Sequence, residues 1–448
     1  MIRQDRVVED VCRRCAQSPD VLKKLNHVWW IEQLRGQSVM KYRTWTKMKR
    51  IQGWTTPLWR MLLVAILTAG MMTPAQAGDR EQAKRMHDRL AGVPPTNAVL
   101  QQMEDAINPA LPGNANDAAV IAMNNVNFYN VTLKNFAAPW TNRDQSVFVP
   151  LNDYVATVIG MIRDDIPFNT LLSADLTYVG NNGVVASAPS AANNDHYAQL
   201  EANNVNLRDE LTDVPQSSVS GIPSQATAGV ITSRAASEAF FIAGTNRAMF
   251  RFTLINHMCN DMEQMHDLKL PPDRIRQDVS RSPGGDSRLF LNNCIGCHTG
   301  MDPMAQAFAY YNYNDVSGRL EYTASGPGPG GTVQPKYFNN DLNFPQGFRT
   351  PDDEWDNYWR NGQNAYLGFS PSLSGSGNGA KSLGEELANS ESFASCQVRK
   401  VFKAVCLRDP EDLTDRNMVN QLTTDFMTTL GYRMKDVFAQ TAVHCMGQ

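Results

Sequence analysis

Residues 294–298 read CIGCH, two cysteines separated by two residues and followed directly by a histidine. This spacing is the attachment signature of a c-type haem. In such a site each thiol adds to one of the two haem vinyl groups, and the imidazole binds the iron from one side. The stretch therefore predicts one covalently bound haem c, with Cys294 and Cys297 as thioether anchors and His298 as the proximal axial ligand.

Two other chemistries use the same residue types. Cysteine and histidine are zinc ligands, but a structural zinc site needs a fourth ligand, and an adjacent cysteine and histidine are crowded around one tetrahedral ion. A C-x-x-C pair can also be a thioredoxin-like redox centre, which belongs in a βαβ context that the sequence does not show. We therefore favour covalent haem over zinc and over a redox dithiol.

The amino-terminal segment indicates export, which covalent haem attachment requires. Residues 61–72 read MLLVAILTAGMM, follow several basic residues and precede the small-residue sequence AQA at 75–77. This is the pattern of a cleaved signal peptide, and the run is shorter than the about 20 apolar residues that a membrane span needs. We interpret 1–77 as a signal or leader segment, with a true start near Met48. We expect a bacterial periplasmic or secreted protein, with no transmembrane segment after cleavage.

Removal of the leader makes the remaining chain acidic. Residues 1–77 contain 13 of the 41 Lys and Arg residues and 5 of the 45 Asp and Glu residues, so 28 basic and 40 acidic residues remain, with a net charge of about −12. Binding to nucleic acid demands basic patches, so we expect no nucleic-acid partner. An acidic exported protein can instead be steered towards a cationic redox partner in the cell envelope.

Six cysteines remain after cleavage, and haem takes two of them. The other four are an even number, which suits disulfide bonds in an oxidising compartment. Cys396 and Cys406 lie on one predicted helix, roughly 15 Å apart, too far for a bond to each other. Two further helices, expected at about 415–430 and 433–446, place Cys406 and Cys445 at matching ends of parallel helices. We therefore favour a Cys406–Cys445 bond, which leaves Cys259 for Cys396. Buried free thiols are the alternative.

The periodicity of apolar residues predicts a mainly α protein. Helical patterns run through 79–165, return at 233–260 and again from about 382, whereas 180–228 reads as a long loop and 318–349 as short strands or a structured loop. The predicted modules are an N-terminal helical module at 78–228, a multi-helix cytochrome c-like haem module at 229–350 with a small irregular or β insertion, and a C-terminal helical bundle at 351–448. Asp286 is a plausible cap for the helix that leads into the haem motif.

The sequence at 294–322, CIGCHTGMDPMAQAFAYYNYNDVSGRLEY, resembles a module of the planctomycete-type cytochrome-like secreted family, in which a single CxxCH motif is followed by Met-Asp-Pro. Three other segments are similar to modules of that family: PFNTLLSADLTYV at 167–179, FASCQVRKVFKAVCLR at 393–408 and GYRMKDVF at 431–438. The resemblance covers about 150–448. It implies a monohaem c-type protein associated with electron transfer, without a defined reaction.

The sixth iron ligand decides between a carrier and a catalyst. Met301 is too close to His298, because three residues span at most about 10 Å and cannot pass around the edge of the haem, and Met304 is only slightly better placed. More distant candidates are Met258, Met262, Met265, Met427, Met434, His257, His266 and His444. We prefer Met434, since it lies in a segment that resembles the family, and an axial methionine raises the haem potential.

The leading prediction is an exported monohaem c-type cytochrome that mediates one-electron transfer to a redox partner in the cell envelope. One alternative is a haem enzyme of peroxidase or oxidase type with an open distal site. A further alternative is a secreted binding or scaffold protein in which the haem is structural.

Overall fold

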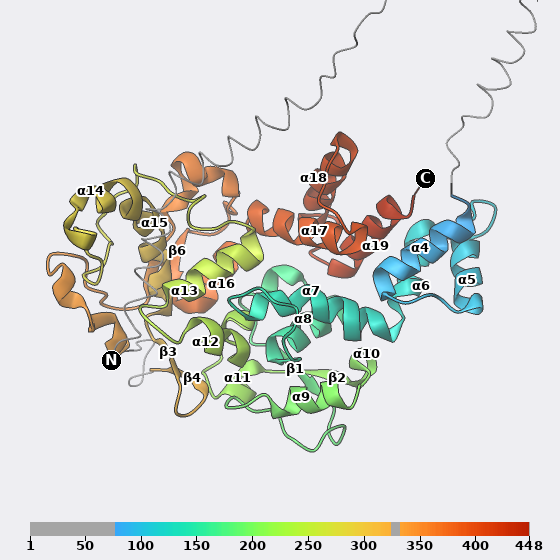
Figure 1. Ribbon diagram of the computed structural model, residues 1–448, viewed down its shortest axis with the longest axis horizontal. Helices are drawn as coiled ribbons and strands as arrows, with labels where there is room; N and C mark the ends of the chain where they lie inside the picture. The colour runs from blue at the N-terminus through green and yellow to red at the C-terminus, as the bar shows by residue number, and fades with distance from the viewer. Residues whose placement is uncertain (1–76, 324–331, 448) are drawn as a thin grey trace, which may run out of the picture. The chain divides into compact units, whose positions relative to one another are not determined.

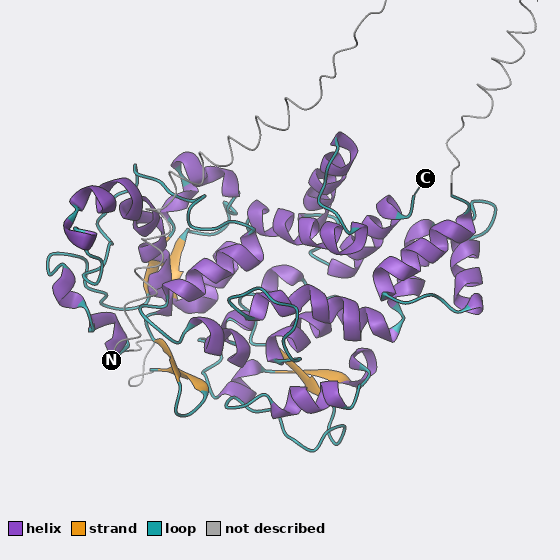
Figure 2. Ribbon diagram, viewed as in Figure 1, coloured by secondary structure: helices purple, strands orange, loops and turns teal. Residues whose placement is uncertain are grey.

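Residues 77–323 and 332–447 are described by a computed structural model, and they form a mainly helical structure with a few short strands (Figures 1 and 2). The mainly α prediction is confirmed. The predicted leader, with its apolar run and its start near Met48, lies outside the described residues except for Ala77. Within those residues, no helix is both long and apolar enough to cross a membrane.

The N-terminal helices are α4 (Asp79–Ala91), α5 (Asn97–Ile107), α6 (Ala115–Met123), α7 (Lys134–Ala137) and α8 (Asp153–Arg163), with π-helical η1 (Phe128–Leu133) and 3₁₀ turns η2 (Ala138–Thr141) and η3 (Phe168–Thr170). Three of the N-terminal α-helices, α5, α6 and α8, begin at polar side-chain caps. Asn114 and Asp117 form a reciprocal capping box at α6, and Asn152 accepts a hydrogen bond from the Val155 amide at α8. The helical prediction for 79–165 is therefore confirmed.

The segment predicted as a long loop at 180–228 contains more structure than its composition indicated. It holds α9 (Asp195–Ala202), α10 (Leu207–Glu210), β2 (Leu211–Val214) and α11 (Gln216–Ser220), and is followed by 3₁₀ turn η4 (Gly229–Thr232). Strand β2 pairs antiparallel with β1 (Thr177–Gly180). His196 anchors the segment, because its Nε2 lies 2.9 Å from the Gly180 amide and its Nδ1 2.7 Å from the Ser187 carbonyl. Such tertiary hydrogen bonds leave no periodic signal in a sequence.

The region around the CIGCH motif consists of short helices and strand pairs. Its helices are α12 (Arg234–Phe240), α13 (Arg247–Thr253), π-helical η5 (Leu254–Met258), 3₁₀ η6 (Pro283–Gly285), α14 (Ser287–Leu289), π-helical η7 (Phe290–Cys294), α15 (Ile295–Ala305) and 3₁₀ η8 (Gln306–Phe308). Asp286 caps α14 by accepting a hydrogen bond from the Arg288 amide, as predicted. Strands β3 (Tyr311–Asn314) and β4 (Arg319–Tyr322) form an antiparallel pair, in line with the predicted insertion.

The C-terminal region is helical again from α16 (Gly379–Ala388). Before it lie 3₁₀ turns η9 (Pro335–Phe338), η10 (Asp341–Asn343), η11 (Tyr358–Arg360) and η12 (Gly362–Leu367), and the antiparallel strands β5 (Glu354–Asp356) and β6 (Ser376–Asn378). After it come α17 (Glu391–Cys406), α18 (Leu413–Met427) and α19 (Met434–Cys445). Helix α17 packs against both α18 and α19, and α19 also lies beside α4 and α6 from the start of the described chain (Figure 1). Residues 78–447 group into one compact unit.

Both favoured disulfide bonds are present. Cys259 is bonded to Cys396, with a Cα–Cα distance of 5.3 Å, and Cys406 is bonded to Cys445, with a Cα–Cα distance of 5.5 Å. The second bond joins the carboxyl ends of α17 and α19, as the parallel arrangement of these helices predicts. The first ties the segment before the CIGCH motif to α17, 137 residues along the chain.

Removing the Cys406–Cys445 bond should lower the free energy of unfolding by about 3–4 kcal/mol, because the bond closes a loop of 39 residues and restricts the unfolded chain. The comparison is urea unfolding of the Cys406→Ala/Cys445→Ala variant against the oxidised wild-type protein. A loss below about 1 kcal/mol would show that the bond does not restrict the unfolded state as this entropic account requires.

Candidate haem site

The CIGCH motif is helical in the structure. Cys294 ends the π-helical turn η7, and α15 continues directly from Ile295 to Ala305. At about 100° per residue, the side chains of Cys294, Cys297, His298 and Met301 leave the helix within an arc of about 100°. The two sulfur atoms and the imidazole therefore share one face, the arrangement that a thioether-bound haem with a histidine ligand needs.

The opposite face of α15 is closed by tight packing. A Cβ atom added to Gly300 would lie 2.0 Å from Nε1 of Trp359, and one added to Gly296 would lie 2.5 Å from Nε2 of His266. Trp359 is fully buried. The two glycines thus allow close packing on the side of α15 that lies opposite the cysteines and the histidine.

The imidazole of His298 is held by a carboxylate one helical turn further on. Its Nδ1 lies 3.2 Å from both Oδ1 and Oδ2 of Asp302, whose side chain is completely buried. A proton on Nδ1 that is donated to Asp302 leaves Nε2 as the nitrogen with a free lone pair. Histidines that bind metals commonly donate their other ring nitrogen to a carboxylate in this way. The contact with Asp302 would support His298 as an iron ligand in this way.

Asp302 belongs to a buried ion-pair network that the sequence did not predict. Arg247 donates Nε and Nη2 to the two carboxylate oxygens of Asp302, at 2.7 and 3.0 Å, and Nη1 and Nη2 to those of Asp278, at 2.6 and 2.9 Å. Arg276 lies on the other side, with Nη2 3.7 Å from Asp302. The guanidinium of Arg281 also interacts electrostatically with both carboxylates, so three arginines surround Asp302 and Asp278.

The two carboxylates of this network are ionised. Burial alone would raise the pKa of Asp302, but Arg247, His298 and Arg276 outweigh it and hold that pKa well below its usual range. Burial also opposes ionisation of Asp278, where Arg247 again prevails and lowers the pKa. In the sequence, Asp302 stood out only as part of the Met-Asp-Pro triplet. No sequence pattern predicted its arginine partners.

The segment after the Cys259–Cys396 bond runs beside the motif. Sγ of Cys297 lies 3.4 Å from the carbonyl oxygen of Met262. The Asp267 amide donates to the Gly296 carbonyl at 2.9 Å, and the Thr299 hydroxyl donates to the Asp267 carbonyl at 3.1 Å. Among the methionines considered as sixth ligands, Met262 is one whose backbone contacts the motif, and its side chain is buried.

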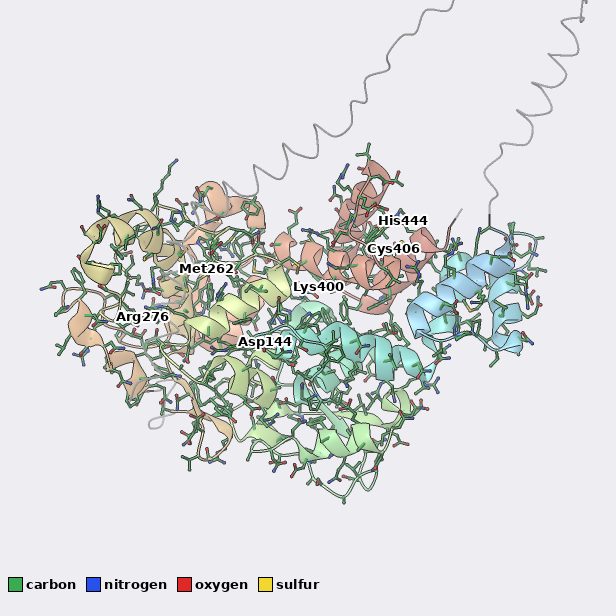
Figure 3. All side chains as sticks on the ribbon, in the orientation of Figure 1. Asp144, Met262, Arg276, Lys400, Cys406 and His444 are labelled. Carbon is green, nitrogen blue, oxygen red and sulfur yellow. A yellow bond between two sulfur atoms is a disulfide. The ribbon has the colours of Figure 1, made fainter. Side chains whose placement is uncertain are left out.

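Met434 is not brought to the motif. It is the first residue of α19, which packs against α17 and α6, whereas α15 lies towards the other end of the molecule in Figure 1. His444, also on α19, is labelled far from Met262 in Figure 3 and pairs with Asp415, with 2.8 Å from Nε2 to Oδ1. Met434 was preferred because its segment resembles the family, but similarity of sequence does not indicate how far a residue lies from His298.

Two further histidines proposed as sixth ligands already have other contacts. Nε2 of His257 lies 2.6 Å from the hydroxyl of Tyr154, and burial, with a contribution from Lys400, holds the pKa of His257 well below its usual value. The ring of His266 packs against Gly296, on the face of α15 away from His298.

A zinc arrangement at the motif is not preformed. In 77–323 and 332–447, no group of three histidine, cysteine, aspartate or glutamate side chains is placed to hold a metal ion. Covalent haem requires no such cluster, since the motif supplies two carbon–sulfur bonds and one nitrogen ligand.

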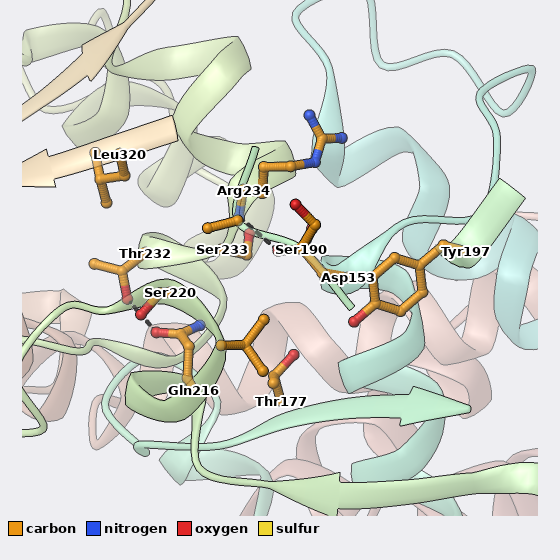
Figure 4. Close-up of a pocket in the computed structure, with 12 residues that line it drawn as sticks. Asp153, Thr177, Ser190, Tyr197, Gln216, Ser220, Thr232, Ser233, Arg234 and Leu320 are labelled. Atoms are coloured by element: carbon orange, nitrogen blue, oxygen red, sulfur yellow. Dashed lines mark hydrogen bonds between the residues drawn. The ribbon is translucent and has the colours of Figure 1, made fainter. Parts of the chain in front are cut away.

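Cavities elsewhere have structural explanations. One of about 20 Å³, lined by Asp153, Tyr197, Gln216, Thr232 and Arg234 among others, is large enough for a single water molecule (Figure 4).

A cavity of about 270 Å³ lies at the carboxyl ends of α17 and α19. There Arg85 donates to the Met446 carbonyl at 2.7 Å and Arg89 to the Val405 carbonyl at 3.1 Å. Arginines in this position satisfy the free carbonyls of helix ends and offset their partial negative charge.

Comparison of the chain with protein-family models, with curated proteins and with solved structures finds no match. The assignment of a function therefore rests on the chemistry and the geometry of the residues themselves.

Proposed function

We propose that the chain is an exported monohaem c-type cytochrome that transfers single electrons to a partner in the cell envelope. The observation that carries the proposal is the shared face of Cys294, Cys297 and His298 on a helix whose other face is closed by Trp359. The resemblance to a secreted cytochrome-like family agrees with it, as do the two disulfide bonds, which are compatible with an oxidising compartment.

The residues would hold the haem as follows. Cys294 and Cys297 would each hold one vinyl carbon through a thioether, formed by addition of S–H across the vinyl double bond with no electron gained or lost. His298 would supply Nε2 to the iron. Bound haem supplies the reversible ferric–ferrous couple.

The surface position of the motif suits electron exchange by contact. Cys294 is buried, whereas Cys297 is partly exposed and the side chain of His298 is 13% exposed. A group bonded to the sulfur of Cys297 therefore lies near the surface. The net charge of about −12 after loss of the leader favours a cationic partner, whose approach electrostatic steering would accelerate at low salt.

Absorption and magnetic spectra of the exported protein test this proposal. A low-spin haem with a methionine-to-iron charge-transfer band is expected for a carrier with Met262 as the sixth ligand, and Met262→Ala should then abolish the band. High-spin ferric haem in the wild-type protein would instead indicate an open sixth position and favour a peroxidase- or oxidase-type enzyme.

A further inference from the structure

Asp302 is the one carboxylate that the described residues place against the imidazole of His298. Both of its oxygens lie 3.2 Å from Nδ1, and its side chain has no exposed surface. The contact spans one turn of α15, so the backbone fixes it. We propose that Asp302 is a positioning residue that donates negative charge to the proximal imidazole and biases the iron towards the ferric state, which lowers the reduction potential relative to the same haem without this contact. This inference rests on the proposed attachment of haem.

The orientation of the imidazole follows from this contact. An imidazole can rotate about its bond to Cβ, and each of its nitrogens can carry the proton. A buried carboxylate beside Nδ1 keeps the proton on that nitrogen and stops the rotation. It leaves the lone pair of Nε2 in a constant direction, which a haem held by two thioether bonds requires.

The electronic effect comes from the same hydrogen bond. A carboxylate that accepts the Nδ1 proton gives the ring part of the character of an imidazolate and makes Nε2 a stronger donor. A stronger donor stabilises ferric iron more than ferrous iron, because the ferric ion carries the greater positive charge. The reduction potential therefore falls, opposite to the effect of an axial methionine.

The surrounding arginines do not cancel this effect. Arg247 and Arg276 pair with Asp302 and Asp278, and the guanidinium of Arg281 also interacts with both carboxylates, so at a distance the positive charges more than balance the two negative charges. The effect that is specific to Asp302 is its short-range hydrogen bond with His298. Arg247 also binds Asp302 through two hydrogen bonds and so keeps its carboxylate in place.

Two isosteric variants separate the effect of a charge in contact with His298 from the effect of a charge elsewhere in the network. Asp302→Asn and Asp278→Asn each remove one negative charge from the same network, but only Asp302 contacts His298. The test is the reduction potential of each haem-loaded variant, measured by spectroelectrochemical titration. We expect Asp302→Asn to shift the ferric–ferrous equilibrium towards ferrous iron at least tenfold, which is about 59 mV for one electron, and Asp278→Asn to shift it by less than half as much on the millivolt scale.

Equal shifts in the two variants, or no shift in Asp302→Asn, would overturn the inference while haem attachment stands. A wild-type chain without covalent haem would instead refute the proposed function, and the inference with it. Proton NMR spectra of the wild-type protein provide a second test that needs no variant. The Nδ1 proton of His298 should exchange slowly with solvent. Rapid exchange would contradict the role of Asp302.

Discussion

Replacing Arg247 with leucine should lower the free energy of unfolding by about 3–5 kcal/mol, because it leaves buried carboxylates without their main counter-ion. The guanidinium of Arg247 bridges Asp302 and Asp278 through four hydrogen bonds of 2.6–3.0 Å. Once it is gone, Arg276 is the nearest remaining cation, at 3.7 Å from Asp302 and 3.9 Å from Asp278. Urea unfolding followed by circular dichroism measures the change.

The matched control is Arg288→Leu. Arg288 also forms an ion pair with an aspartate, Asp286, but its side chain is 82% exposed, and exposed pairs contribute little to stability. We expect no measurable change in that variant. A loss below about 1 kcal/mol in Arg247→Leu would mean that the network does not stabilise the region around the motif as buried ion pairs do when one partner is removed.

Replacing both Cys294 and Cys297 with alanine should abolish covalent haem. Each thioether needs one of these sulfur atoms, and no other residue of the motif can form a carbon–sulfur bond to a vinyl group. The single variants should retain less covalent haem than the wild-type protein, since one bond remains available in each. The measurement is haem staining of a denaturing gel, with equal loading confirmed by protein stain.

The matched control for this experiment is the Cys406→Ala/Cys445→Ala variant. It also removes two sulfur atoms, from the disulfide that joins α17 and α19. It should keep the haem stain, although the chain is less stable. Retention of the stain in the Cys294→Ala/Cys297→Ala protein would show that the haem is bound elsewhere.

Much of the local structure could be predicted because its causes are local. Asp286 caps α14 through a contact with an amide two residues away, and apolar residues recur at helical spacing along α17. The disulfide bond between Cys406 and Cys445 could also be predicted, because two short turns determine the relative directions of three consecutive helices.

The chemical surroundings of His298 could not be predicted, because they depend on long-range packing. Arg247 lies 55 residues before Asp302 and 31 before Asp278, and nothing in the spacing of these residues indicates a contact. The same dependence on long-range packing is why the sequence left eight candidates for the sixth iron ligand, Met262 among them. The distance of α19 from α15 likewise follows from the packing of α19 against α6 and α17.

A haem-stained denaturing gel of the wild-type chain shows whether Cys294 and Cys297 carry a haem. The full chain should be exported from a bacterium that contains a cytochrome c maturation system. Covalent attachment predicts a stained band at the mass of the processed chain, because thioether bonds survive denaturation. A folded, disulfide-bonded wild-type protein that gives no stain under these conditions would contradict it.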